Sequence, residues 1–183
     1  RGINQISIDE YRRVFKFPVK DYYKELGFDF KLEPFEECGL EFINEFKERK
    51  FDANLFPDTI KTLSGISKSG ITQSILSAQN QLILNETIEY YKLKNYFIKI
   101  NGLDDYYAHS KIDMGIRWLS KLDYECNEVL MIGDTIHDFE VAEAMGIDCI
   151  LVSHGHNSIE RLKKSGLVVL DSLSDIYKFL FEL

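Results

Sequence analysis

The chain has 183 residues, of which 45% are hydrophobic, enough to bury one core with a small additional domain. The formal net charge of −8, with basic residues scattered among acids, argues against a nucleic-acid-binding protein, which normally carries a basic stripe. No run approaches 18 apolar residues, so we expect no membrane span.

The three cysteines indicate a reducing environment. They are odd in number and widely spaced, at Cys38, Cys126 and Cys149, and their neighbours are apolar. This pattern favours reduced core residues over a disulfide or zinc framework. Because the first residues also lack the apolar core of a signal peptide, we expect a cytoplasmic protein.

Residues 1–55 predict helices only. Ser7 followed by Glu10 fits a capping box at the start of a short helix. Pro18 and Pro34 suit the first turns of two further helices. We therefore expect an all-helical first domain that ends at residue 55.

Residues 56–183 alternate between helices and short apolar strands. The predicted strands lie at 71–77, 97–100, 128–132, 147–152 and 167–170, with helical patterns between them and at both ends. Such alternation predicts right-handed βαβ units. The fold class is therefore α/β, a Rossmann-like parallel sheet with helices on both faces, preceded by the helical domain.

In sheets of this kind ligands bind beyond the carboxyl ends of the strands. Ser77 ends the first predicted strand, and its hydroxyl, with the backbone N–H groups that follow it, can bind a phosphate oxygen. The alternative is that Ser77 is simply the N-cap of the next helix. Lys111 opens a later helix, where an ammonium can neutralise a phosphate or steady a carboxylate. The alternative for Lys111 is a solvated surface residue.

The segment Gly133-Asp134-x-x-x-Asp138 carries the strongest signal. We expect both carboxylates to face one small volume at the sheet edge, and such a pair of hard oxygen ligands suits Mg²⁺. The alternative is that Asp134 or Thr135 caps the following helix while Asp138 favours its positive end. His154 and His156 have metal-like spacing, but no third ligand accompanies them, so we do not expect zinc.

Together these features resemble the haloacid dehalogenase-like hydrolase superfamily, in particular its phosphoglycolate-phosphatase-like branch with a helical cap. Ser77, Lys111 and the pair Asp134 and Asp138 match that family's second, third and fourth motifs, in the same order and at strand ends. The segment "INGLDD" and the all-helical opening also resemble that branch.

The resemblance implies a Mg²⁺-dependent phosphatase that hydrolyses a small phosphorylated metabolite through a phospho-aspartate. Ser77, Ala78 and Lys111 would bind the phosphate, with Ser77 and Lys111 as catalytic residues. Asp134 would bind Mg²⁺, and Asp138 would bind it directly or through a water. The resemblance leaves the substrate and the oligomeric state open.

In this family a cap selects the substrate, and here the resemblance assigns that role to residues 1–55. The cap would close over the site and exclude water. Four basic side chains of its first helices are candidates to contact an anionic group of the substrate: Arg12, Arg13, Lys16 and Lys20. The alternative for each is a solvated helix face.

The chain departs from the family at the first motif, Asp-x-Asp-x-Thr, which supplies the nucleophile. No such sequence is present, and the first acids, Asp9 and Glu10, belong to a helical pattern. We expect the motif and its strand upstream of residue 1, because the family's first strand is central in the sheet and its loss would leave two strand edges unpaired. The 183 residues alone are then expected to be inactive.

Three alternatives remain. The chain can be a catalytically inactive family member that acts as a binding or regulatory module. It can perform mutase or dehalogenase chemistry, although a dehalogenase would not need the two acids as a metal site. A receiver-type signalling domain is disfavoured, because its acids should come at the start of the fold.

Overall fold

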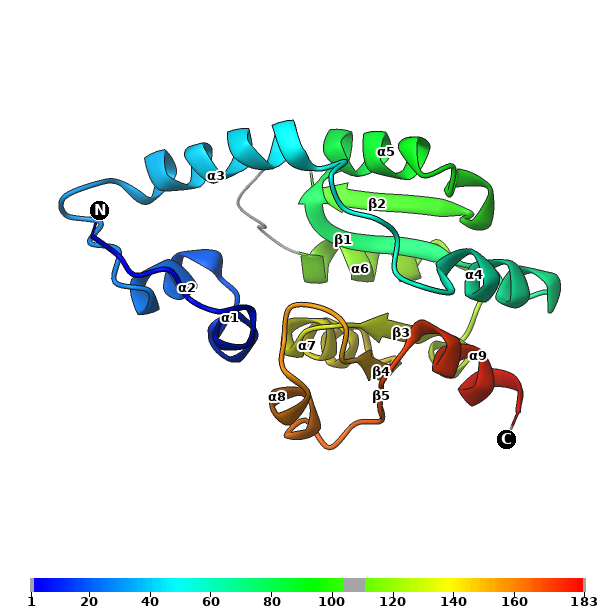
Figure 1. Ribbon diagram of the computed structural model, residues 1–183. Coiled ribbons are helices and arrows are strands. Elements are labelled where there is room, and N and C mark those ends of the chain that lie inside the picture. Colours follow the sequence, from blue (N-terminus) through cyan, green and yellow to red (C-terminus); the bar gives the residue numbers. More distant parts are fainter. Residues whose placement is uncertain (1, 104–110, 183) are drawn as a thin grey trace.

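A computed structural model describes residues 2–103 and 111–182 of the chain (Figure 1). Three helices come first: α1 (Ile8–Val14), α2 (Val19–Glu25) and α3 (Phe35–Arg49). The remaining elements are α4 (Thr59–Lys68), β1 (Ser74–Asn80), α5 (Gln81–Tyr90), η1 (Lys94–Tyr96), β2 (Lys99–Leu103), α6 (Lys111–Leu119), η2 (Cys126–Glu128), β3 (Leu130–Gly133), α7 (Ile136–Met145), β4 (Asp148–Val152), α8 (Ile159–Lys163), β5 (Val169–Leu170) and α9 (Leu173–Phe181). This order follows the predicted alternation.

The first helices begin where the sequence predicts. The Ser7 hydroxyl accepts a hydrogen bond from the Glu10 N–H at 3.2 Å and so caps α1. Pro18 and Pro34 occupy the N-cap positions of α2 and α3, one residue before the expected first turn. Gly27, just beyond α2, has a φ of +98°, a conformation that favours glycine at a helix end.

All strand pairs are parallel, as predicted. β1 pairs with β2 through Ser74 and Lys99, and β3 pairs with β4 through Leu130 and Asp148. β5 pairs with the other edge of β4. However, the strands form two sheets, one of order β1-β2 and one of order β3-β4-β5. The sheet is therefore divided between β1 and β3, which leaves two unpaired edges of the kind expected where the family's first strand is missing.

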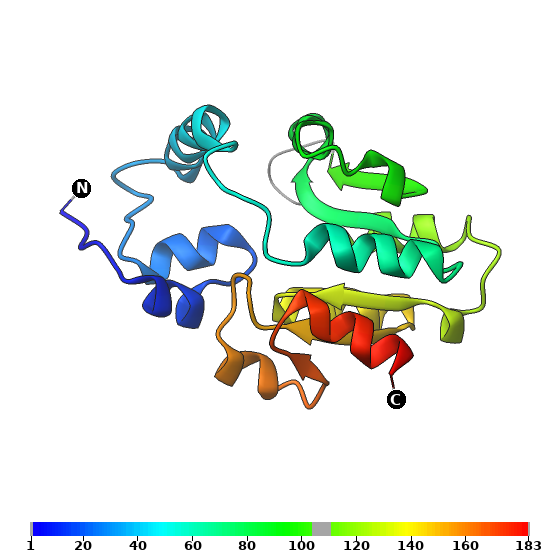
Figure 2. The same cartoon turned by 45° about the vertical axis from the view of Figure 1, so that its right-hand side comes forward.

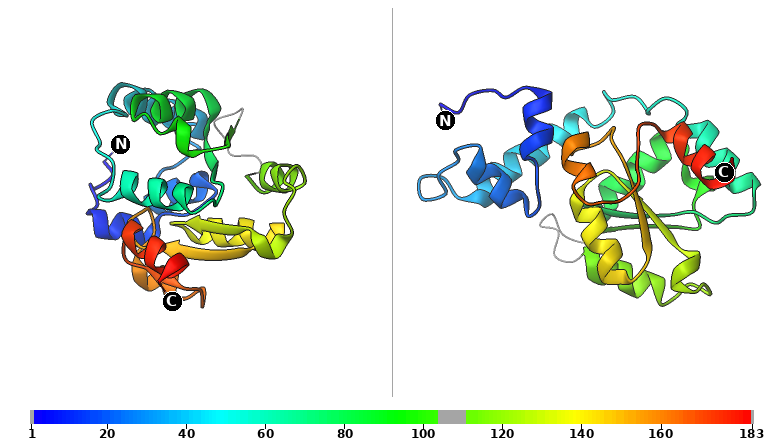
Figure 3. Two further views of the ribbon diagram at one scale, coloured as in Figure 1. Left: turned by 90° about the vertical axis from the view of Figure 1, so that its right-hand side faces the viewer. Right: turned by 90° about the horizontal axis from the view of Figure 1, so that it is seen from below.

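Helices cover both faces of the divided sheet, which confirms the layered α/β prediction (Figures 2 and 3). On one face, Ile75 of β1 packs against a cluster that includes Leu84 and Ile88 of α5. On the other face, Gly115 of α6 lies so close to Met145 of α7 that an added Cβ would stand 2.5 Å from its sulfur. Contacts between α6 and α7, and between α4 and α9, join the two half-sheets.

A cavity of about 1430 Å³ lies between the half-sheets. Residues of both facing strands line it, among them Ile75 and Leu76 of β1 and Met131 and Ile132 of β3. Within the described residues, β1 pairs only with β2, and β3 pairs only with β4. Each facing edge therefore presents backbone N–H and C=O groups toward the cavity without a strand partner.

Other expectations have mixed outcomes. None of the described helices has both the length and the apolar character needed to span a bilayer. Cys38 is buried, but Cys126 is exposed, so the prediction of a core position was wrong for Cys126. The reason is that Cys126 starts the short helix η2 at the surface instead of continuing the adjacent apolar strand. Of "INGLDD", the two acids, residues 104 and 105, lie outside the described residues.

Gly102 lies where β2 passes closest to the start of α5. A Cβ at this position would stand 2.8 Å from the Gln79 carbonyl oxygen and 2.8 Å from the Gln81 Cα, both of which are backbone atoms. We expect Gly102→Ala to lower the free energy of unfolding by about 1–3 kcal/mol, as overpacking does, measured by urea denaturation. Gly39→Ala is the matched control, because Gly39 lies within α3 with open space around it. It should stabilise the protein by about 0.5–1 kcal/mol, and equal effects of the two variants would contradict this packing.

Candidate phosphate and metal site

Ser77 lies within β1, which continues three residues beyond the predicted strand end to Asn80. The Ser77 hydroxyl oxygen accepts a hydrogen bond from the Gln79 N–H at 3.1 Å. The side chain of Asn80, not that of Ser77, caps α5 by accepting from the Leu82 N–H at 3.1 Å. The alternative that Ser77 is a helix N-cap was therefore wrong, and its O–H can still donate to a phosphate oxygen.

Ala78 follows in the part of β1 where the regular pairing with β2 is interrupted. The register shifts between Leu76 and Asn80, so this stretch departs from a uniform ladder. Such irregularities occur next to active sites, where they redirect the chain. Ala78 also lines the cavity.

Lys111 is the first residue of α6, as predicted, but it is not a surface residue. Only 8% of it is exposed, and its ammonium donates a hydrogen bond to Oδ1 of Asp138. A buried ammonium requires a paired anion, because an isolated charge in the interior is strongly unfavourable. The alternative of a solvated lysine was therefore wrong.

Asp138 is the most heavily hydrogen-bonded carboxylate of the site. Its Oδ2 accepts from the Asp134 N–H at 3.0 Å, from the Thr135 N–H at 2.9 Å and from the Thr135 hydroxyl at 2.8 Å. Burial by itself would raise the pKa of Asp138, but Lys111 and these hydrogen bonds together hold that pKa below its usual range. Gly133 permits this approach, since a Cβ there would stand 2.2 Å from the Asp138 Cβ.

Asp134 follows the end of β3 and has one oxygen available. Its Oδ2 accepts from the His156 backbone N–H at 2.7 Å. Gly155 is packed against the same carboxylate, and an added Cβ would stand 1.8 Å from Oδ2. Among the described residues, no hydrogen bond reaches Asp134 Oδ1. Asp134 lines the cavity, so within the described part of the chain this oxygen is a candidate to bind a cation or a water.

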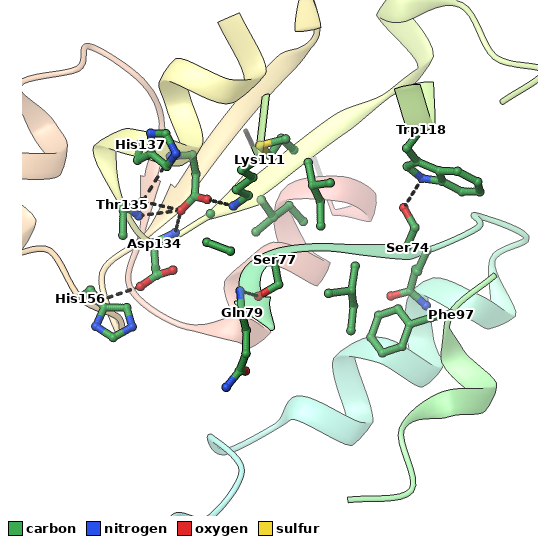
Figure 4. Close-up of a pocket in the computed structure, with 18 of the residues that line it drawn as sticks. Ser74, Ser77, Gln79, Phe97, Lys111, Trp118, Asp134, Thr135, His137 and His156 are labelled. Atoms are coloured by element: carbon green, nitrogen blue, oxygen red, sulfur yellow. Dashed lines mark hydrogen bonds and ion pairs between the residues drawn. The ribbon is translucent and has the colours of Figure 1, made fainter. Parts of the chain in front are cut away.

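The four side chains that the sequence singled out line the same cavity. Ser77 comes from β1, Lys111 from α6, and Asp134 and Asp138 from the segment after β3. Figure 4 shows Ser77, Lys111 and Asp134 around one space. The expected convergence at the carboxyl edge of the strands is therefore present in the fold, while the chemical role of each residue stays a prediction.

Around this space the histidines have other partners. The ring of His156 forms a hydrogen bond with the Tyr11 hydroxyl. Nδ1 of His137 lies 3.0 Å from a carboxylate oxygen of Glu140, which accepts the hydrogen bond. The ring of His154 lies against Phe56, with 5.7 Å between ring centroids. Within the described ranges, no group of three His, Cys, Asp or Glu side chains is arranged to hold a metal ion.

Asn157 is a structural residue of the site that the sequence reasoning missed. It is 2% exposed, and its Oδ1 accepts from the Ile136 N–H at 3.0 Å at the start of α7. Its Nδ2 donates to the Phe15 carbonyl at 3.0 Å, just after α1. Asn157 and Gly155 belong to the loop after β4. The rule that places ligands at strand ends could have identified this loop, because its strand had been predicted.

The comparison with protein families decides the assignment. The sequence model described as haloacid dehalogenase-like hydrolase matches residues 1–152. The chain belongs to this family. It is similar to the phosphoglycolate phosphatase of Aliivibrio fischeri, with 26% identity over 129 residues that cover 70% of this chain and 56% of the relative. The phosphoglycolate phosphatase of Agrobacterium fabrum is 25% identical over 144 residues, which cover 77% of this chain and 61% of that protein.

These shares mean that the chain spans less than two thirds of either relative's length.

Solved structures resemble it over nearly its whole length. A predicted phosphatase from Clostridium acetobutylicum has a TM-score of 0.75 at 21% identity, covering 96% of this chain and 81% of its own. Protein Tyrosine Kinase A of Mycobacterium tuberculosis has a TM-score of 0.77 at 18% identity, with coverage of 97% and 83%. At such identities the likeness concerns the fold, which proteins with differently named activities share.

The Lys111–Asp138 ion pair gives the first prediction for this site. Lys111→Met leaves the Asp138 carboxylate buried without its cation, which should lower the free energy of unfolding by about 3–5 kcal/mol. The matched control is Lys178→Met, which removes an exposed ion pair with Asp175 of 2.9 Å and should have a far smaller effect, because water screens exposed charges. Urea denaturation of both variants measures the difference, and equal losses would contradict the buried pair.

The lowered pKa of Asp138 predicts a dependence of stability on pH. A carboxyl whose folded pKa lies below its unfolded value stabilises the protein above the unfolded pKa, and this contribution disappears as the pH falls through the folded pKa. The difference in free energy of unfolding between the wild type and Asp138→Asn should therefore narrow as the pH is lowered from 6 toward 3. A difference that stays constant across this range would contradict the charged state inferred for Asp138.

Proposed function

We propose that this chain is part of a Mg²⁺-dependent phosphatase that hydrolyses small phosphate monoesters through a phospho-aspartate intermediate. The observation that carries the proposal is the convergence of Ser77, Lys111 and Asp134 beside a gap in the sheet. Phosphate monoester hydrolysis needs a hydrogen-bond donor and cations around the phosphoryl group, and a nucleophile in line with the leaving group. The described residues offer a hydrogen-bond donor, Ser77, and a cation, Lys111, but not the nucleophile.

The nucleophile, in this proposal, comes from a further parallel strand between β1 and β3, expected upstream of residue 1. Two observations support it. Each facing edge has unpaired backbone groups, and the cavity between them exceeds the roughly 300–1,000 Å³ of ordinary ligand pockets. A strand in this position would pair with both edges and deliver its carboxyl end beside Ser77 and Asp134.

The acids present fit Mg²⁺ as one part of its ligand set. In proteins Mg²⁺ is held by one or two carboxylates, with waters and substrate phosphates in the other positions. Asp134 offers Oδ1 directly. Asp138 has both oxygens engaged by Lys111, Thr135 and the Asp134 N–H, so we assign it to the outer shell of the metal site. When bound, Mg²⁺ polarises the phosphoryl oxygens and neutralises part of their charge.

The reaction then has two displacements. In the first, an aspartate oxygen forms a bond to phosphorus, the ester P–O bond breaks, and the leaving alcohol takes up a proton. In the second, water attacks the phospho-aspartate, which releases inorganic phosphate and restores the carboxylate. Throughout, Ser77 and the Ala78 N–H bind one phosphoryl oxygen, and the Lys111 ammonium stabilises the negative charge.

A binding or regulatory role without catalysis is the second candidate. The carboxylates lining the cavity in the described part of the chain are Glu128, Asp134 and Asp138. Asp138 is paired with Lys111, and Glu128 accepts a hydrogen bond from the Glu125 N–H at 2.8 Å at the amino end of β3. Neither is available as a nucleophile, and in this proposal Asp134 is assigned to Mg²⁺. Residues 1–183 alone should therefore bind phosphate without hydrolysing its esters.

The proposal is tested with protein expressed from its complete reading frame. The release of phosphate from a panel of monoesters is measured. We expect hydrolysis that disappears when Mg²⁺ is chelated. Ser77→Ala should lower kcat/KM about 10- to 100-fold, as loss of one hydrogen bond to a charged group does. Ser74→Ala is the matched control, because Ser74 lies earlier on β1 and its hydroxyl accepts from the Trp118 indole at 3.1 Å. Equal effects of the two variants, or no hydrolysis of any ester, would contradict the proposal.

A further inference from the structure

The two arginines of α1 donate hydrogen bonds to backbone carbonyl groups. Arg12 donates through Nε to the Gly155 carbonyl at 3.2 Å, and Arg13 donates through Nε to the Asp9 carbonyl at 3.2 Å. Arg12 thus reaches a loop that is distant in the sequence, whereas Arg13 reaches back within its own helix. That either side chain also contacts an anionic group of a substrate stays a prediction.

The two lysines that follow α1 also have partners within the first 55 residues. The ammonium of Lys16 lies 2.5 Å from a carboxylate oxygen of Glu25. The ammonium of Lys20 lies 5.6 Å and 5.5 Å from the ring centroids of Phe30 and Phe35, within the range of cation–π attraction. A contact of either lysine with a substrate likewise stays a prediction.

The β4–α8 loop, residues 153–158, contacts the carboxylate that we propose to bind Mg²⁺. The backbone N–H of His156 donates to Oδ2 of Asp134 at 2.7 Å, a bond that Figure 4 shows. The neighbouring Gly155 packs so closely on the same carboxylate that no Cβ would fit there. This loop therefore orients the carboxylate and leaves Oδ1 as the oxygen that no hydrogen bond of the described residues reaches.

The α1 segment, residues 11–15, holds the side chain of His156 in turn. The Tyr11 hydroxyl forms a hydrogen bond with Nδ1 of His156. The ring of Phe15 stacks on the same imidazole, with 4.8 Å between ring centroids and 30° between the ring planes. The residue whose N–H orients Asp134 is thus fixed from its other side by two aromatic side chains of the α1 segment.

Further hydrogen bonds join the α1 segment to the β4–α8 loop, and Figure 2 shows the two side by side. The Ser158 N–H donates to the Arg12 carbonyl at 3.0 Å, and Nδ2 of Asn157 donates to the Phe15 carbonyl at 3.0 Å. The Arg12 side chain adds its bond to Gly155. Because loops are in general more mobile than the elements they connect, such contacts order this loop before a ligand binds and so lower the entropic cost of binding.

We propose that the α1 segment positions the metal site. Through His156 and Gly155 it orients the Asp134 carboxylate, and this orientation raises the affinity for Mg²⁺. Tyr11 and Arg12 are then positioning residues, because they act on the cation only through the β4–α8 loop. The inference rests on the role proposed above for Asp134. Groups that hydrogen-bond to a metal ligand commonly change metal affinity by roughly 10- to 100-fold.

Calorimetric titration with Mg²⁺ of protein expressed from its complete reading frame tests the inference. Tyr11→Phe, which removes only the hydroxyl, should raise the Kd for Mg²⁺ about 2- to 10-fold, the effect of one hydrogen bond. Tyr124→Phe is the matched control. The Tyr124 hydroxyl lies 3.2 Å from Oγ1 of Thr72, and both residues lie at the amino ends of their strands, away from Asp134. This variant also loses a hydrogen bond, but its Kd should equal that of the unaltered protein.

The two arginines provide a second matched pair. Arg12→Met removes the bond to the Gly155 carbonyl, whereas Arg13→Met removes an equal charge whose bond stays within α1. Loss of a positive charge favours cation binding, so electrostatics alone predicts tighter Mg²⁺ binding for both variants. The inference instead predicts that Mg²⁺ binds to Arg12→Met about 2- to 10-fold more weakly than to Arg13→Met.

Equal Kd values for the two arginine variants, or for Tyr11→Phe and the unaltered protein, would overturn the inference. The kcat of Tyr11→Phe at saturating Mg²⁺ separates positioning from structural damage. It should stay at the value of the unaltered protein, because excess cation compensates for weaker binding. A lower kcat with an unchanged Kd for Mg²⁺ would also overturn the inference.

A further variant separates failure of this inference from failure of the proposed function. Asp134→Ala should abolish Mg²⁺ binding, since it removes the proposed ligand. If Asp134→Ala keeps the Mg²⁺ affinity of the unaltered protein, the metal site proposed above is wrong and this inference fails with it. If no ester is hydrolysed but the Kd values follow the expected order, only the catalytic proposal is contradicted.

Discussion

The buried ion pair between Lys111 and Asp138 connects the two halves of this fold. Lys111 begins α6, which packs on β1, and Asp138 lies in the first turn of α7, which packs on β3. Each charge is largely removed from water and therefore requires the other, together with the hydrogen bonds from Thr135. This requirement fixes both helix starts at the same edge of the sheet. It also fixes the positions of Lys111 and of the segment that carries Asp134 relative to each other.

Between those halves, the divided sheet explains why the site is incomplete within the described chain. Within the described residues, β1 and β3 face each other with unpaired edges, and Ser77 and Asp134, which we propose to bind phosphate and metal, stand near the ends of these two strands. A strand placed between them would satisfy both edges and bring a third group to the point where Ser77 and Asp134 already converge. In this account one additional strand between β1 and β3 both stabilises the sheet and completes the active site.

The sequence predicted the order of strands and helices along the chain and the convergence of Ser77, Lys111, Asp134 and Asp138, because each depends on local pattern and on the parallel topology. The gap within the sheet was anticipated only through family resemblance. Contacts between distant segments were not predictable. The side chain of Asn157 joins Ile136 to Phe15, and no periodicity or cap signals such a bond. The partners of the basic residues in the first helices were likewise invisible, since a lysine that binds a substrate and one that rests on an aromatic ring look alike in sequence.

The central claim is tested most directly by an experimental structure. It should be determined with Mg²⁺ and inorganic phosphate, on protein expressed from its complete reading frame. The account predicts one more parallel strand, hydrogen-bonded to both β1 and β3, with an aspartate at its carboxyl end beside a phosphate bound by Ser77 and Lys111. A structure in which no strand bridges β1 and β3, or in which the bridging strand carries no carboxylate at that end, would contradict it.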